Sequence, residues 1–233
     1  MLVLPRLVQK FNQYSYCLLD LLKIPDSQSP RGFRLINELP DRRTVYVTTT
    51  GVLNALWQAW NNLCKSYWKI FIYGGQLSHV STILPFTYAR RGLVASDDEH
   101  LLYSFLYPTR PGYYQRQYHN QRIEQYREPS WGRRDLLSQI ATYYQNIYPQ
   151  IASLLGALSL AGNAIDHLQY VRNASVHINN ASLEKLQQLA PFYSVRTMRY
   201  PSDYAFAVNI RTGKLAVEYW IDELCTMCTL LYI

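Results

Sequence analysis

The stretch from Asp166 to His177 contains the residue types in this sequence that are best suited to phosphate chemistry: Arg172, Asn173 and His177. The planar guanidinium fork of arginine matches the oxygens of a phosphate group. Arg172 and His177 are five residues apart, so an ideal helix places them about 140° apart around its axis. They converge if the helix ends near Ser175 and the backbone turns, or if a second chain supplies one of them. The amide of Asn173 can orient either neighbour.

The order Arg172-Asn173, three residues, then His177 resembles the signature of HEPN domains (higher eukaryotes and prokaryotes nucleotide-binding), which lies at the end of a long bundle helix. The resemblance covers roughly residues 51–233 and implies a HEPN-like helical bundle. It also implies a homodimer with facing motifs that acts as a metal-independent endoribonuclease without a cofactor. Such proteins serve as toxins, antiphage defence effectors or RNA-processing enzymes. We therefore expect that the chain binds RNA and that an antitoxin or another regulatory partner controls it.

The resemblance also assigns a role to each residue of the motif. The 2′-hydroxyl of RNA attacks the adjacent phosphate, His177 transfers protons and Arg172 stabilises the charge that develops at phosphorus. Asn173 positions one of these two side chains. The products are a 2′,3′-cyclic phosphate and a 5′-hydroxyl, and DNA is inert because it lacks the nucleophile.

A second interpretation gives the same residues no catalytic role. Arg172 then caps the carboxyl end of its own helix, where cations are favourable, and His177 is an ordinary polar residue of the following turn. The rival functions are a non-catalytic HEPN-like subunit that binds nucleic acid or a nucleotide, and a helical interaction protein. Some HEPN proteins have tyrosine two residues after the histidine, but this chain has Asn179, so we expect no tyrosine-modification switch.

Residues 109–134 form a second candidate, a basic and aromatic segment. It contains six Arg, two Glu and five aromatic residues, a local charge of +4 within the +7 of the chain. Arginine interleaved with tyrosine is typical of grooves that bind single-stranded RNA, although a solvated connector with its rings packed on the bundle fits equally well. The residues predicted to bind RNA are Arg116, Arg122, Arg127, Arg133, Arg134, Tyr113, Tyr114 and Tyr118.

The composition is that of a folded, basic protein. Among 233 residues, 48% are hydrophobic and 17% charged, which excludes a disordered chain. The basic residues are 17 Arg and 6 Lys, and there are 21 Tyr, a bias that hints at nucleic acid but also fits an arginine-rich proteome. Cys225 and Cys228 supply two of the four ligands that zinc needs, so we expect two buried thiols and no metal site.

Targeting patterns are weak in this chain. Residues 1–22 lack the order of charged, apolar and small residues that marks a signal peptide. The longest apolar stretch, Ile151 to Ile165, is shorter than a membrane span. We therefore predict a cytoplasmic protein that does not associate with a membrane.

The element pattern predicts a mainly α fold with a small β element. Residues 1–50 read as an N-terminal extension with a helix at 7–22, a turn-rich break at 25–32 and a strand at 44–50. Residues 51–233 read as the helical domain, interrupted by an exposed segment at 108–130. Its helices are predicted at 51–73, 76–84, 97–107, 131–147, 149–176, 182–189 and 220–231, with a hairpin at 204–219 before the last.

Overall fold

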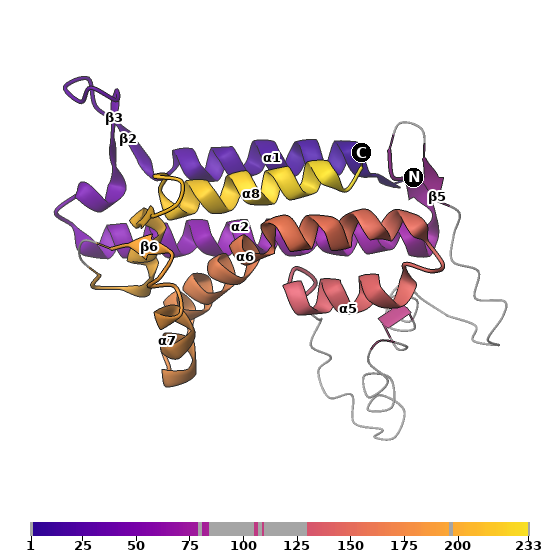
Figure 1. Cartoon of the computed structure of the whole chain (residues 1–233). Coiled ribbons are helices and arrows are strands. Elements are labelled where there is room, and N and C mark those ends of the chain that lie inside the picture. The colour runs from indigo at the N-terminus through magenta and orange to yellow at the C-terminus, as the bar shows by residue number, and fades with distance from the viewer. Residues whose placement is uncertain are drawn as a thin grey trace, which may run out of the picture. The chain divides into compact units, whose positions relative to one another are not determined.

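A computed structural model describes residues 2–78, 81–83, 105–106, 109, 130–195 and 198–232 of the chain. Helices dominate these residues and the strands are two or three residues long, which confirms the predicted mainly α fold (Figure 1). The chain divides into two compact units. Unit 1 comprises Met1–Val8, Asn61–Leu160 and Thr229–Ile233, and unit 2 comprises Gln9–Trp60 and Ala161–Cys228.

Among the described residues, five α-helices contribute to unit 2: α1 (Leu4–Asp20), α2 (Arg42–Tyr73), α6 (Ala152–Val176), α7 (Asn180–Gln187) and α8 (Ala216–Leu230). The rings of Phe11 on α1 and Trp60 on α2 lie 5.9 Å apart. Tyr16 Oη on α1 donates a hydrogen bond of 3.0 Å to Asp222 on α8. These contacts place α1 against both α2 and α8 within the unit.

The strand predicted at residues 44–50 is wrong, because this segment is the start of α2. Buried residues occur at positions 45, 49, 52, 53 and 56, which is the spacing of a helix face. The β-branched residues suggested a strand, but a buried face overrides so small a difference in propensity. Asp41 begins the helix, since its carboxylate accepts hydrogen bonds from the Arg43 backbone at 3.1 Å and from the Thr44 hydroxyl. The predicted boundary between residues 50 and 51 therefore falls inside α2.

Two small sheets belong to unit 2. Strands β2 (Lys23–Pro25) and β3 (Phe33–Leu35) form an antiparallel hairpin whose loop is the predicted turn-rich break. Strands β6 (Tyr193–Ser194) and β7 (Val208–Asn209) form a second antiparallel pair. Two short 3-10 helices adjoin them, η1 (Ile36–Glu38) and η4 (Pro201–Phe206).

The hairpin predicted at residues 204–219 is largely wrong. Only one bridge, between Val208 and Leu215, crosses the turn at Gly213, and α8 already begins at Ala216. Val217, Trp220 and Leu224 are buried at helical spacing. Glu218 also accepts a hydrogen bond of 3.3 Å from the backbone N–H of Leu215. This N–H group at the start of α8 is therefore paired, and the helix begins before the predicted start at residue 220.

Unit 1 is built on the second half of α2 and on α5 (Arg134–Tyr144). Phe105 stacks on Tyr144 at 4.0 Å, and its ring lies 6.0 Å from Trp68. Strand β4 (Gly75–Gln76) lies between β1 (Leu2–Val3) and β5 (Thr82–Ile83). The helix predicted at 76–84 is therefore wrong in its described part. A Cβ on Gly75 would lie 2.7 Å from the Leu2 carbonyl oxygen, so only glycine permits this close pairing.

The helix predicted at 149–176 is confirmed as η3 (Pro149–Ile151) followed by α6. Among the described residues it is the one helix long and apolar enough to cross a membrane, by length and composition alone. Its most apolar window is 56% buried within the structure, as expected for the core helix of a soluble protein. Cys225 and Cys228 are buried on α8, as predicted.

Candidate functional site

Arg172 lies in the last two turns of α6 and is held by two amide side chains. Its Nε and Nη2 atoms donate hydrogen bonds of 3.0 and 2.7 Å to Oδ1 of Asn54 on α2. Its Nη1 atom donates one of 3.0 Å to Oδ1 of Asn173. A guanidinium group has five N–H donors, so these three bonds fix its plane and leave two N–H groups for a ligand. We call Arg172, Asn54 and Asn173 the amide cradle.

The charge of Arg172 has no acidic partner among the residues that the structure describes. The side chain is half-buried, and this burial lowers the pKa of the guanidinium from its usual value. Both groups that orient it are neutral. A fixed, partly desolvated cation without a carboxylate partner attracts an external anion strongly, so the amide cradle can hold a phosphate group.

Asn54 is the member of the cradle that sequence reasoning missed. It is 118 residues from Arg172 in the chain and occupies an exposed position of α2, outside the apolar stripe. Nothing in the local sequence distinguishes it from other exposed polar residues of that helix. Only the pairing of α2 with α6 brings it to the motif.

His177 follows α6 directly, in the bend after Val176. Its backbone N–H donates to the Asn173 carbonyl at 2.7 Å, and its own carbonyl accepts from Ser182 Oγ at 2.6 Å. Ser182 belongs to α7 (Asn180–Gln187), which Asn179 caps through a reciprocal pair of hydrogen bonds with Ser182. The backbone of His177 is thus fixed on both sides while its imidazole is exposed to solvent.

The structure does not bring the two ends of the motif together within one chain. Within the described residues, no hydrogen bond or ring contact joins His177 to Arg172. The guanidinium of Arg172 does not cap α6 through a hydrogen bond in the described part of the chain, although its charge still lies near the carboxyl end of the helix. The hydrogen bonds of its guanidinium go to side-chain amides, and none goes to a carbonyl of α6 in the described part of the chain.

A pair of tyrosines supports the same end of α6. Tyr46 Oη on α2 donates a hydrogen bond of 2.7 Å to the carbonyl of Ser175. The ring of Tyr46 lies 4.8 Å from the ring of Tyr200, at an interplanar angle of 37°. Because Ser175 lies between Arg172 and His177, these tyrosines connect the motif to the segment before η4.

The basic and aromatic segment is mostly outside the described residues, including Arg116, Arg122, Arg127, Tyr113, Tyr114 and Tyr118. Arg133 and Arg134 are described at the start of α5. Arg133 forms an ion pair with Asp135, so part of its charge is already compensated. Both residues belong to unit 1, whereas the amide cradle belongs to unit 2.

His167 has a structural environment. Its Nδ1 atom lies 2.8 Å from Tyr193 Oη, and Trp220 Nε1 donates to the same oxygen at 2.7 Å. The side chain is 6% exposed, and burial lowers the pKa of its imidazole to about 4. This buried trio joins α6, β6 and α8.

A comparison with family models, with curated proteins and with solved structures finds no match to this chain.

Proposed function

We propose that the chain is a metal-independent endoribonuclease of the HEPN type that acts as a homodimer. The observation that carries this proposal is the amide cradle, which holds the cation of Arg172 half-buried and, within the described residues, without an acidic partner, five residues before the exposed His177. RNA supplies both the anion that the cradle accepts and an internal nucleophile. A nuclease that uses the 2′-hydroxyl needs proton transfer and charge stabilisation from its side chains.

In the proposed reaction, the 2′-oxygen forms a bond to phosphorus while the bond from phosphorus to the 5′-oxygen breaks. His177 takes the proton of the 2′-hydroxyl, and a second imidazole gives a proton to the departing 5′-oxygen. The two free N–H groups of Arg172 bind the non-bridging oxygens, whose negative charge increases in the transition state. Among the described residues, one chain offers one exposed histidine at this place, so in the proposed reaction the second imidazole comes from a partner chain with its motif facing the first.

Within the described residues of one chain, no hydrogen bond joins His177 to Arg172, and this favours a second candidate, a subunit that binds RNA without cleaving it. Such a protein uses the cation of Arg172 for phosphate and has no role for the imidazole. Both candidates have RNA as a partner and differ in one reaction. In the cell, we propose a cytoplasmic toxin or antiphage effector for the nuclease, under the control of an antitoxin or regulatory partner.

The test is cleavage of a pool of structured and unstructured RNA in EDTA by the parent chain and by Arg172→Ala and His177→Ala variants. Loss of about a hundredfold or more in each variant is expected, with 2′,3′-cyclic phosphate ends on the products of the parent. Arg6→Ala removes an exposed arginine of α1 and serves as the control for charge. Equal cleavage by all four proteins would refute the assignment, and binding without cleavage by the parent would support the second candidate.

A further inference from the structure

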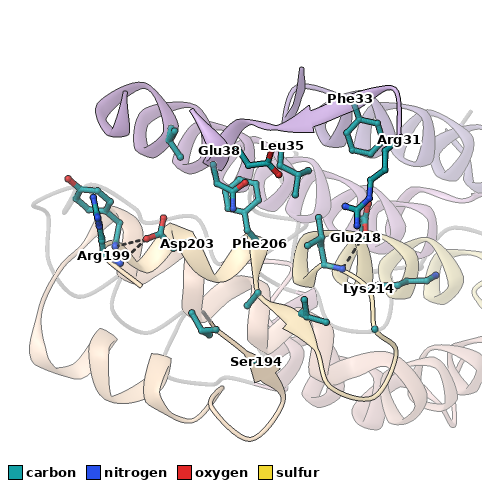
Figure 2. Close-up of a pocket in the computed structure, with 18 of the residues that line it drawn as sticks. Arg31, Phe33, Leu35, Glu38, Ser194, Arg199, Asp203, Phe206, Lys214 and Glu218 are labelled. Carbon is teal, nitrogen blue, oxygen red and sulfur yellow. Dashed lines mark hydrogen bonds between the residues drawn. The ribbon is translucent and has the colours of Figure 1, made fainter. Parts of the chain in front are cut away.

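A pocket of about 830 Å³ lies in unit 2, between two groups of elements. One wall consists of β3, η1 and the first turn of α2, and the other of the segments around η4 and before α8. Its volume is within the range of roughly 300–1,000 Å³ that small-molecule sites occupy. Figure 2 shows Arg199 and Asp203 at one end, Arg31 and Lys214 at the other, and Phe206 between them. We call this cavity the η4 pocket.

Three acidic residues line the η4 pocket, Glu38, Asp203 and Glu218, and the carboxylates of the last two accept backbone hydrogen bonds. Asp203 Oδ2 accepts hydrogen bonds from the backbone N–H groups of Arg199 and Tyr200, at 2.8 and 3.0 Å. Glu218 accepts from the backbone before α8, at 3.3 Å. Through these hydrogen bonds, the two carboxylates hold the segment before η4 and the segment before α8, which form one wall of the pocket. They reduce the ability of the acids to neutralise the cations of the pocket.

Two arginine side chains of the pocket are available to a ligand. The guanidinium groups of Arg31 and Arg199 have no hydrogen-bond or ion-pair partner among the residues that the structure describes. Lys214, in contrast, binds Asp222 at 2.7 Å, and Arg42 donates to the Asn37 carbonyl at 2.7 Å. The pocket therefore offers unused planar donors at both ends, the arrangement that a chain with regularly spaced phosphates would meet.

An aromatic surface accompanies the cation at the Arg199 end. Tyr200 lines the pocket and is 37% exposed, and its ring is supported by Tyr46 at 4.8 Å. An aromatic ring that is held in place beside an arginine is a surface on which any of the nucleobases can stack. The same Tyr46 is bonded to Ser175 at the end of α6, so this end of the pocket adjoins the Arg172–His177 motif.

We propose that the η4 pocket binds nucleotides of single-stranded RNA that flank the scissile phosphate, with a base on Tyr200 and phosphates on Arg199 and Arg31. This inference rests on the proposed function for the identity of the polymer. It assigns substrate binding to residues outside the motif and outside the basic and aromatic segment. Recognition through stacking and phosphate contacts makes the pocket tolerant of sequence.

Binding is measured separately from cleavage by using labelled single-stranded RNA whose 2′-hydroxyls are methylated, with the full chain. Tyr200→Ala weakens binding about 5- to 150-fold, the range for losing one stacked base, while Tyr200→Phe retains the ring and binds like the parent. Arg199→Ala weakens binding and reduces the slope of log affinity against log salt by about 1. Arg6→Ala, the matched control on α1, changes affinity less than Arg199→Ala.

Folding is checked by thermal unfolding of each variant, and the exposed Arg199 side chain keeps the test valid if Tyr200→Ala unfolds. Parental affinity and salt slope in Arg199→Ala and Arg31→Ala overturn the proposal, as does a parent chain that binds no single-stranded RNA. Adenosine monophosphate is then added as a competitor of the labelled RNA, to distinguish a pocket that binds RNA from one that binds free nucleotides. If pocket variants lose the mononucleotide but retain RNA, the pocket is a site for free nucleotides and the RNA proposal fails.

The two proposals fail separately. A parent that cleaves RNA while pocket variants bind and cleave equally well overturns the pocket alone. A parent that binds RNA through Arg199 and Tyr200 but does not cleave it overturns the nuclease alone.

Discussion

The substitution Asn54→Asp tests the central claim about the amide cradle. It replaces a neutral amide oxygen by a carboxylate oxygen of the same size, at the atom that accepts hydrogen bonds of 3.0 and 2.7 Å from Arg172. The geometry of the cradle is preserved, but the guanidinium gains an acidic partner, which it lacks among the described residues of the parent. If the uncompensated charge binds the phosphate, this conservative change is harmful.

The magnitude follows from Coulomb's law. With charge centres about 4 Å apart, the interaction is about 1 kcal/mol in water and about 4 kcal/mol at an effective dielectric constant of 20. A half-buried pair lies between these limits, near 2 kcal/mol, which corresponds to roughly a 30-fold change in an equilibrium or rate constant. Because Asn54 is exposed, the stabilisation of the folded protein is smaller, at most about 1 kcal/mol.

The assay compares initial rates of RNA cleavage in EDTA and midpoints of thermal unfolding for three proteins. Asn54→Asp is expected to lose roughly 30-fold in rate while its midpoint rises by up to about 4 °C. Asn62→Asp makes the same chemical change at another exposed position of α2 and is expected to leave the rate within threefold of the parent. The reasoning is refuted if Asn54→Asp is as active as Asn62→Asp, or if both are impaired equally.

Three further predictions concern stability and reactivity. Because burial lowers the pKa of His167 to about 4 and an unfolded histidine titrates near 6.5, the unfolded chain binds a proton first as the pH falls. The free energy of unfolding therefore decreases by about 2–3 kcal/mol from pH 7 to pH 4.5, and urea unfolding of His167→Gln shows a smaller decrease. Gly51→Ala stabilises the helix interior by about 0.5–1 kcal/mol, because the added Cβ meets nothing within 4 Å. Gly75→Ala is destabilising, because the added Cβ meets a carbonyl oxygen at 2.7 Å. The midpoint of thermal unfolding is expected to rise in the first variant and to fall in the second. A maleimide labels the native protein once, at the exposed Cys17, since the other three cysteines are buried; fast labelling of a second thiol would contradict this packing.

The long apolar helices were predictable because periodic burial determines them. The pattern between residues 149 and 176 predicted a helix that the structure confirms within a few residues. The start of α2 was not predicted, because the β-branched run at 44–50 matched strand propensity and the capping role of Asp41 was overlooked. Composition over seven residues was a weaker determinant than the face that the helix buries.

The position of Arg172 and His177 at the end of a long helix was predictable from sequence, but the environment of the arginine was not. Arg172 and Asn173 are neighbours in the chain, and their contact follows from that position. Asn54 reaches Arg172 only through the packing of α2 on α6, which no short-range pattern specifies. The η4 pocket is likewise formed by segments far apart in the chain.

The chemical nature of the amide cradle determines what the pH dependence of this site reports. Amides do not ionise in the accessible range, and the guanidinium of arginine stays charged throughout it. Asn54 and Asn173 therefore hold Arg172 in one orientation and one charge state at acidic, neutral and basic pH. If the chain cleaves RNA as proposed, a bell-shaped pH profile of the rate therefore reports the ionisation of groups outside the amide cradle.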